Sequence, residues 1–356
     1  MRGGLVAWAV VAAAFACMGV VCRPAGAADA EKARADAFQR KLALGARDIA
    51  RKHLKGMGSE YSAYVDDDSR VIYLSTLDKE HLARTYGLLR EYTAAHRAEE
   101  KGLFARRMPW YLLVILPTTD DYEKIAERAG FDAEKNKGFC TSDGRKLVSI
   151  DRGSILIHEH THALHVADMQ NARQDHPIWI KEGLAALYEF SKATSEGVVP
   201  MVDRRIRTVQ RAARTGKLVP LKKLIVMDRR EFMADASLHY AEARYLMYYL
   251  YANKQLKNWY SDYKKTYSRD PSGLKALERA LGGTIEQVQR DWIEWLGKLR
   301  MTPGTGHHGE ARLGVEVKDE KRGVKVVALV EGGAAKTAGR IKVGDILTKI
   351  DGHPTP

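Results

Sequence analysis

Two histidines four residues apart in a helical segment constrain this chain more than any other feature of its sequence. Residues 156–165 read LIHEHTHALH, in which Glu159 stands next to His158 and three positions before His162. Side chains four apart project from one face of a helix, so both imidazoles can reach one zinc ion at about 2.0 to 2.1 Å. The spacing predicts a helix with a zinc-binding face, bordered by the Glu159 carboxylate. The alternative is a histidine-rich tract without a defined site.

A catalytic zinc site needs a third protein ligand, and two residues compete for that place. Glu182 lies 20 residues after His162 in a predicted helix over 177–190, where small residues at positions 183, 185 and 186 favour close packing on the first helix. Asp168 is the rival in an HExxHxxGxxD alignment, but that pattern needs a glycine where His165 stands. We expect Glu182 to be the ligand, His165 to be the reserve candidate and His160 to be structural.

The remaining pattern predicts an α+β protein with strands first and helices after them. The apolar run WYLLVILP at 110–117 predicts a central strand, and Asp143-Gly144 predicts a hairpin turn between two short strands. Helices are expected over residues 31–57, 78–99, 154–169, 177–190, 204–223, 241–253 and 284–299, with a further strand over 71–74.

HEHTH followed by PIWIKEGLAALYE resembles the gluzincin zinc metallopeptidases, and the similarity extends over about 138–299. This resemblance implies a zincin-like core with a mixed sheet, an edge strand along 147–150, an HExxH helix and a helical C-terminal subdomain. It implies one Zn²⁺ per chain held by His158, His162 and Glu182, and peptide-bond hydrolysis with Glu159 as general base. Tyr240 matches the tyrosine that hydrogen-bonds the oxyanion in related enzymes, and Tyr245 and His239 are its nearby alternatives.

Endopeptidase action on a protein or peptide is the expected activity, and two other functions remain open. An aminopeptidase would need carboxylates that hold a free amino group, and upstream of the motif only Asp143 and Asp151 offer them. An inactive pseudo-peptidase that serves as an envelope scaffold is the other alternative. It is disfavoured because the base and all three ligands are present.

Residues 1–27 carry the pattern of a Sec-type signal peptide, with Arg2, an apolar run and an A-x-A site ending at Ala27. The chain is therefore expected to be exported to the periplasm, envelope or exterior, with a membrane anchor as the alternative. Cys140 is then the one cysteine left, so no internal disulfide can form.

The mature chain divides by its pattern into two folded parts. The peptidase domain is expected over 28–300, with an N-terminal part to about 150 and an active-site and helical part from 151. Residues 301–311 have linker composition, and 312–356, with LGVEV, VEGGAAKTAG and VGDILTKIDG, resemble a PDZ domain that binds peptide C-termini. With only 44 residues from Leu313 to Pro356, it is expected to be an incomplete module, with the natural protein continuing beyond Pro356.

A net charge of +13 raises nucleic acid as a partner, but the sequence argues against it. The basic residues are scattered, and no nucleic-acid-binding motif accompanies them. An anionic cell-envelope surface is the expected partner for the charge, and the sequence does not fix the oligomeric state.

Overall fold

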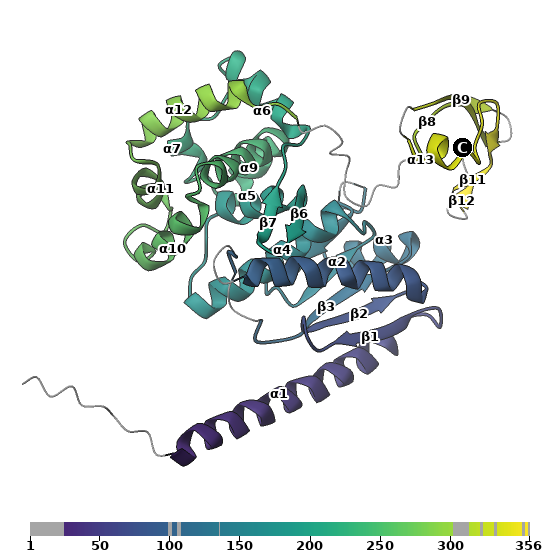
Figure 1. Ribbon diagram of the computed structural model, residues 1–356, viewed down its shortest axis with the longest axis horizontal. Coiled ribbons are helices and arrows are strands. Elements are labelled where there is room, and N and C mark those ends of the chain that lie inside the picture. Colours follow the sequence, from purple (N-terminus) through teal and green to yellow (C-terminus); the bar gives the residue numbers. More distant parts are fainter. Residues whose placement is uncertain are drawn as a thin grey trace, which may run out of the picture.

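The computed structural model describes residues 25–98, 102–104, 108–134, 136–301, 313–320, 323–330, 333–350 and 353–354 (Figure 1). Of the predicted signal segment, 1–27, only the last three residues fall within these ranges, as the start of helix α1 (Ala25–Leu54). In the described part of the chain, every helix is too short or too polar to cross a membrane.

A five-stranded mixed sheet forms the first half of the fold, with the order β1-β2-β3-β5-β4. Its strands are β1 (Ser62–Asp66), β2 (Val71–Ser75), β3 (Leu112–Leu116), β4 (Gly138–Cys140) and β5 (Lys146–Ser149). Strands β2, β3 and β5 run parallel, while β1 and β4 pair antiparallel at the two edges. The predicted central strand is confirmed, since all five residues of β3 are buried. The predicted edge strand is wrong: 147–150 lies inside the sheet, and β4 forms the edge.

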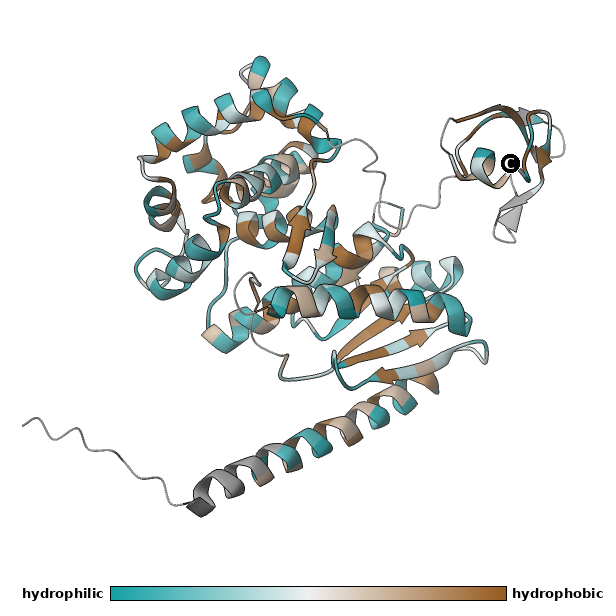
Figure 2. Ribbon diagram, viewed as in Figure 1, coloured by the Kyte–Doolittle hydropathy of each residue, from teal (hydrophilic) through white to brown (hydrophobic). Residues whose placement is uncertain are grey.

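Alternating side chains of the strands divide the sheet into two buried faces. Ile72, Leu113 and Val148 face one way, where they pack with residues of α1 and of α3 (Thr119–Arg128). Val114 and Leu147 face the other way, toward α2 (Lys79–Arg97) and α4 (Ser154–Ala172). Figure 2 shows the apolar character of these strands, which both helical layers cover. The sheet therefore holds α4 on one face, close to the β4 edge.

Helices make up the second half, as the α+β prediction requires. Its elements are α4, α5 (Ile178–Glu189), the hairpin β6 (Ser191–Thr194) and β7 (Gly197–Pro200), α6 (Arg205–Arg214), α7 (Leu221–Leu224), α8 (Arg229–Ala234), α9 (Ala236–Ala252), α10 (Leu256–Thr266), α11 (Leu274–Leu281) and α12 (Ile285–Lys298). Helix α5 is buried between α4 and α9. The single helix predicted over 204–223 is wrong. Helix α6 ends before Gly216, which takes a left-handed φ of +65°, and α7 begins after Pro220.

The C-terminal part is small and β-rich. Strands β8 (Val315–Glu320), β9 (Gly323–Leu329) and β10 (Ile346–Leu347) form a three-stranded antiparallel sheet, with the short helix α13 (Ala334–Ala338) and the pair β11 (Lys349–Ile350) and β12 (His353–Pro354) beside it in sequence. Gly314 has a left-handed φ of +66°, and a Cβ there would lie 2.7 Å from the Gly333 Cα. A glycine is therefore required where the segment enters β8.

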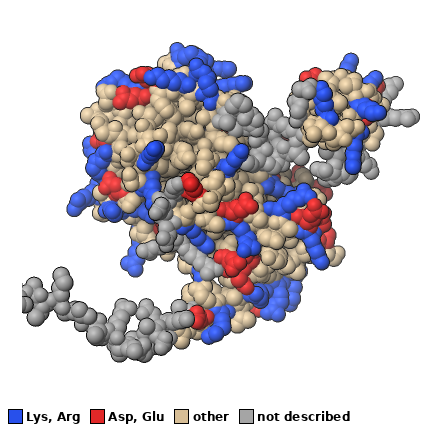
Figure 3. All heavy atoms as spheres, in the orientation of Figure 1, with Lys and Arg blue, Asp and Glu red and all other residues tan. Residues whose placement is uncertain are grey.

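The surface charge agrees with a scattered distribution. Figure 3 shows Lys and Arg side chains spread over the face in view, with Asp and Glu side chains between them.

Candidate metal centre

The N-terminal turn of α4 is fixed by an aspartate that precedes the helix. Gly153 is the N-cap residue, and the Asp151 carboxylate accepts hydrogen bonds from the backbone N–H of Gly153 (2.8 Å) and Ile155 (3.0 Å). These bonds satisfy donors that the first turn of a helix leaves unpaired. The helix then carries His158 and His162 one turn apart, with their Nε2 atoms 3.1 Å from each other.

Helix α5 brings Glu182 to these two imidazoles. The Glu182 side chain is buried, and its Oε2 atom lies 3.5 Å from His158 Nε2 and 3.3 Å from His162 Nε2. The small residues of α5 were expected to allow its close packing on α4, and for Gly183 this expectation is wrong, because Gly183 faces α9. A Cβ at Gly183 would lie 3.1 Å from the Ala243 carbonyl oxygen and 3.0 Å from the Met247 side chain. The glycine lets α5 and α9 pack backbone to backbone.

The two Nε2 atoms and the Glu182 Oε2 atom have the spacing that a tetrahedral metal site would need. Two atoms that each lie about 2.0 to 2.1 Å from one tetrahedral zinc ion are about 3.3 Å apart. The observed separations are 3.1, 3.3 and 3.5 Å. Among the described residues, this is the one group of three or more histidine, cysteine or acidic side chains with atoms close enough to share an ion. The residues present therefore fit the predicted metal.

The pKa values of the ionisable groups in the cluster are strongly shifted. Burial alone would raise the pKa of Glu182, but the imidazoles of His162 and His158 outweigh burial and hold it well below its usual range. Burial would likewise lower the pKa of His158, but the adjacent carboxylates of Glu182 and Glu189 raise it to about 10. The buried carboxylates thus require a positive charge between them.

Glu189 is a residue of this site that the sequence reasoning missed. Its Oε2 atom lies 3.2 Å from His158 Nδ1, and its Oε1 atom accepts a hydrogen bond from Arg205 Nη2 at 3.0 Å. A carboxylate on the second nitrogen of a metal-binding imidazole fixes the orientation and tautomer of the ring. The available signal was spacing: Glu189 follows Glu182 by seven residues, two helical turns, and so shares its face of α5.

Glu159 lies between the histidines and the β4 edge. Burial raises its pKa, although His158, His162 and the Cys140 backbone N–H act in the opposite direction. The β4 register explains the last contact. The Thr141 N–H donates a hydrogen bond to the Lys146 carbonyl, on the side of β5. Because successive N–H groups of a strand point to opposite sides, the Cys140 N–H points away from β5, to the edge of the sheet. The carboxylate is therefore next to both the cluster and the edge strand.

Of the three candidate oxyanion donors, the structure brings Tyr240 to the cluster. Its ring centroid lies 6.3 Å from that of His158, and burial together with the charges of Glu182 and Glu159 raises the pKa of its hydroxyl group. Tyr245 is fully buried and donates to Asp203 Oδ1 at 2.8 Å. His239 is bound through Nδ1 to the Phe232 carbonyl at 2.7 Å. Tyr245 and His239 therefore belong to the core.

The rival ligands lie elsewhere on α4. Asp168 accepts hydrogen bonds from Tyr260 (2.7 Å) and Lys264 (2.8 Å), so the structure does not bring it to the histidine pair. The reserve candidate, His165, is buried with its Nε2 atom 2.8 Å from His176 Nδ1. Neither residue joins the cluster.

Comparison with known proteins divides the chain into two matched segments. Residues 153–273 match the family described as "Protein of unknown function (DUF1570)". This range covers about a third of the chain and includes His158, Glu159, His162, Glu182 and Tyr240. Residues 305–356 match the PDZ domain. The predicted resemblance of the C-terminal segment, here called the PDZ segment, is thereby confirmed. No curated protein matches the chain significantly.

Proposed function

We propose that this chain is a zinc-dependent peptidase of the gluzincin type, with one zinc ion held by His158, His162 and Glu182. One observation supports this most strongly. Glu182 Oε2 is buried without a hydrogen-bond donor, yet it faces two imidazole Nε2 atoms at 3.3 and 3.5 Å. Buried carboxylate oxygens in folded proteins are paired or coordinate metals. A metal ion is the partner that suits this donor set.

The surrounding residues supply the groups that hydrolysis needs. A zinc ion bound there would supply a water of lowered pKa and would polarise a carbonyl group. Glu159 accepts the proton of the attacking water, because its pKa is raised by burial, and then returns that proton to the departing amine. Tyr240 keeps its proton because its pKa is raised, so its hydroxyl group donates a hydrogen bond to the developing oxyanion.

The free edge of β4 is where we place the substrate backbone. The Cys140 N–H points outward and is bonded to the Glu159 carboxylate, and the Cys140 carbonyl and the backbone groups of Gly138, two residues away, point to the same side. An extended peptide that pairs with these groups adds a strand to the sheet and runs past the cluster. Extended peptides are therefore the proposed substrates.

The PDZ segment supports peptide binding by the chain. We propose that it captures peptides or chain termini, and that the cluster cleaves peptide bonds. We also place this activity outside the cytoplasm, because residues 1–27 have the pattern of a secretory signal.

Replacing Glu159 tests the proposal by separating metal binding from chemistry. The wild-type chain should contain one zinc per molecule by elemental analysis and should cleave an unfolded protein. Glu159→Gln should keep its zinc and lose at least about 100-fold in kcat/KM, because an amide cannot accept the proton of water. Glu123→Gln, an exposed substitution on α3, is the matched control and should change neither property.

Two results would contradict the proposal in different ways. A zinc-loaded wild-type chain that cleaves no peptide in a complex mixture would leave a binding scaffold built on the PDZ segment. Equal turnover of Glu159→Gln and the wild type would show that this carboxylate is not the base.

A further inference from the structure

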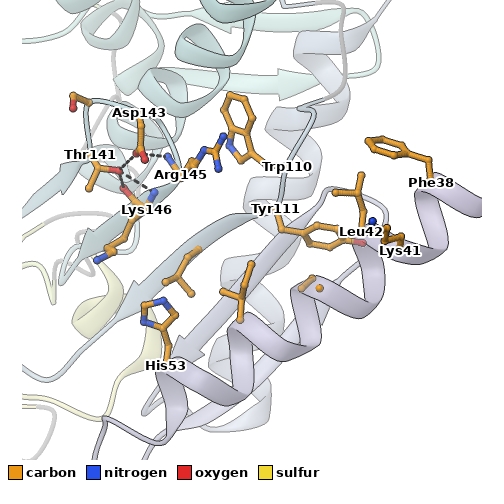
Figure 4. Close-up of a pocket in the computed structure, with 15 residues that line it drawn as sticks. Phe38, Lys41, Leu42, His53, Trp110, Tyr111, Thr141, Asp143, Arg145 and Lys146 are labelled. Carbon is orange, nitrogen blue, oxygen red and sulfur yellow. Dashed lines mark hydrogen bonds between the residues drawn. The ribbon is translucent and has the colours of Figure 1, made fainter. Parts of the chain in front are cut away.

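A long groove lies on the sheet face opposite α4, between α1 and the β4–β5 hairpin (Figure 4). Its volume is about 830 Å³, within the range of roughly 300 to 1,000 Å³ that is usual for small-molecule sites. Phe38, Leu42 and Ile49 form the wall on α1, while Tyr111 and Leu113 form the floor. Phe38 and Ile49 remain 55% and 41% exposed, so the wall presents apolar surface that an occupant would cover.

The rim of this groove is cationic. Lys41 contributes from α1, and Arg145 and Lys146 contribute from the hairpin. Asp143 is the one acid among the described residues that line the groove. Its carboxylate is already engaged, because Oδ1 accepts hydrogen bonds from the Thr141 hydroxyl group (2.6 Å) and the Arg145 backbone N–H (3.1 Å). The groove therefore matches an anion rather than a cation.

The positive charges concentrate where α1 ends. Burial and then the charges of Lys146 and Lys52 lower the pKa of His53, which shows that cations surround this imidazole. A second cavity of about 640 Å³ shares His53, Thr141 and Lys146 with the groove. It adds Arg128 to the basic groups, together with Lys124, which pairs with Asp121 at 3.6 Å. An anionic head group would therefore sit at the His53–Lys146 end.

We propose that the groove binds a long-chain anionic amphiphile, chemically a fatty acid. Its carboxylate lies at His53 and Lys146, and its acyl chain runs along α1 toward Phe38. These two ends of the α1 wall are 15 residues apart, about 22 Å of helix, which leaves room for an extended chain. One linear wall and one apolar floor suit a single acyl chain, while the basic rim selects the anionic head. This inference does not rest on the proposed peptidase activity.

Displacement of 1-anilinonaphthalene-8-sulfonate from the full-length protein measures the binding. Laurate, myristate and palmitate, below their micelle concentrations, should bind with affinity that rises about tenfold for each added pair of methylene groups, the gain expected for buried CH₂. Hexadecanol should bind at least about tenfold more weakly than palmitate, because it lacks the charge. Equal affinity across the series, or equal affinity of acid and alcohol, would overturn the proposal.

Filling the groove tests its location. Gly45 lies on the groove wall, and a Cβ there would have no neighbour within 4 Å, so a side chain can start from this position and Gly45→Phe should place its ring in the groove. Gly87→Phe on α2 is the matched control, because that helical glycine is equally unobstructed and lies outside the groove. Losing a helical glycine favours folding in both variants, which circular dichroism checks.

Gly45→Phe should weaken palmitate binding at least about tenfold, while Gly87→Phe should bind as the wild type does. A folded Gly45→Phe variant with unchanged palmitate affinity would place the site elsewhere, and so would an equal loss in both variants.

Discussion

Helix α4 carries two pairs of histidines that use the same residue type in opposite ways. His158 and His162 face carboxylates on α5, and the pKa of His158 is raised to about 10. His160 and His165 face Thr93, Phe104 and His176, and burial lowers the pKa of both imidazoles, that of His160 to about 3.

The difference shows that the histidines alone do not define the site. All four side chains lie on one helix, and His160 and His165 are the more deeply buried pair. What separates the two pairs is the element that each side chain meets: α5 places two acidic groups against His158 and His162, whereas His160 meets α2 and His165 meets aromatic rings. The carboxylates of α5 should therefore control metal binding, and the residues that contact His160 and His165 should control stability.

The largest expected effect comes from removing the carboxylate between the two metal-facing imidazoles. Glu182→Gln should weaken zinc binding more than about 100-fold, beyond the usual range for a group outside the ligand set, as measured by competition with a chromophoric chelator. Asp168→Asn, on the other side of α4, is the control and should stay within about threefold of the wild type. If Asp168→Asn loses zinc while Glu182→Gln keeps it, Asp168 and not Glu182 is the third ligand.

A smaller effect is expected from the carboxylate that orients His158. Glu189→Gln should lower zinc affinity about 10- to 100-fold, since the amide keeps the shape but not the charge that holds the imidazole. Thr93→Val removes the equivalent partner of His160, whose Nε2 atom lies 3.2 Å from the hydroxyl group, and should leave zinc affinity unchanged. Equal zinc affinities for Glu189→Gln and the wild type would show that the ring is held by packing alone.

The smallest effect concerns acid stability and the aromatic face. The unfolded chain protonates His176 below its ordinary pKa of 6.5, whereas burial lowers that pKa to about 3 in the native protein. The unfolded state therefore binds more protons as pH falls below about 6.5, and His176 alone decreases the free energy of unfolding by about 2 kcal/mol between pH 7 and pH 5.

Denaturant unfolding at both pH values checks this contribution. His176→Asn should lose about 2 kcal/mol of the pH 7 to pH 5 difference, while His81→Gln, at a half-exposed position on α2, should keep the whole difference. An unchanged difference in His176→Asn would show that this imidazole is protonated in both states.

Local pattern was sufficient to predict much of the fold and the members of the cluster. The run at 110–117 is the buried β3, and the helix with His158 and His162 extends as its periodicity predicts. The spacing of residues within each of two helices is local information, and it was enough to predict Glu182 as the third member of the cluster. The helix predicted over 204–223 failed even though its breakers, Gly216 and Pro220, stand in the sequence. There the amphipathic pattern continues past a glycine and a proline, and the backbone of these two residues ends the helix.

The β4 edge, the role of Glu189 and the partner of Gly183 depend on which elements pack together in the fold, and local sequence patterns do not encode that packing. The β4 edge is set by strand order, because β5 inserts beside β3 although it follows β4 in sequence. The role of Glu189 depends on Arg205 and His158, which approach it from different helices. Gly183 was correctly judged to be a packing residue, but its partner is α9 because α5 is buried on several sides.

The contact at Gly183 also limits how this gene can change. Any other amino acid at this codon adds a Cβ against the Ala243 carbonyl, on the helix that carries Tyr240. A single missense change therefore crowds two helices whose side chains meet near His158, although it alters none of those side chains. Only synonymous changes at this codon leave the contact between the two helices as it is.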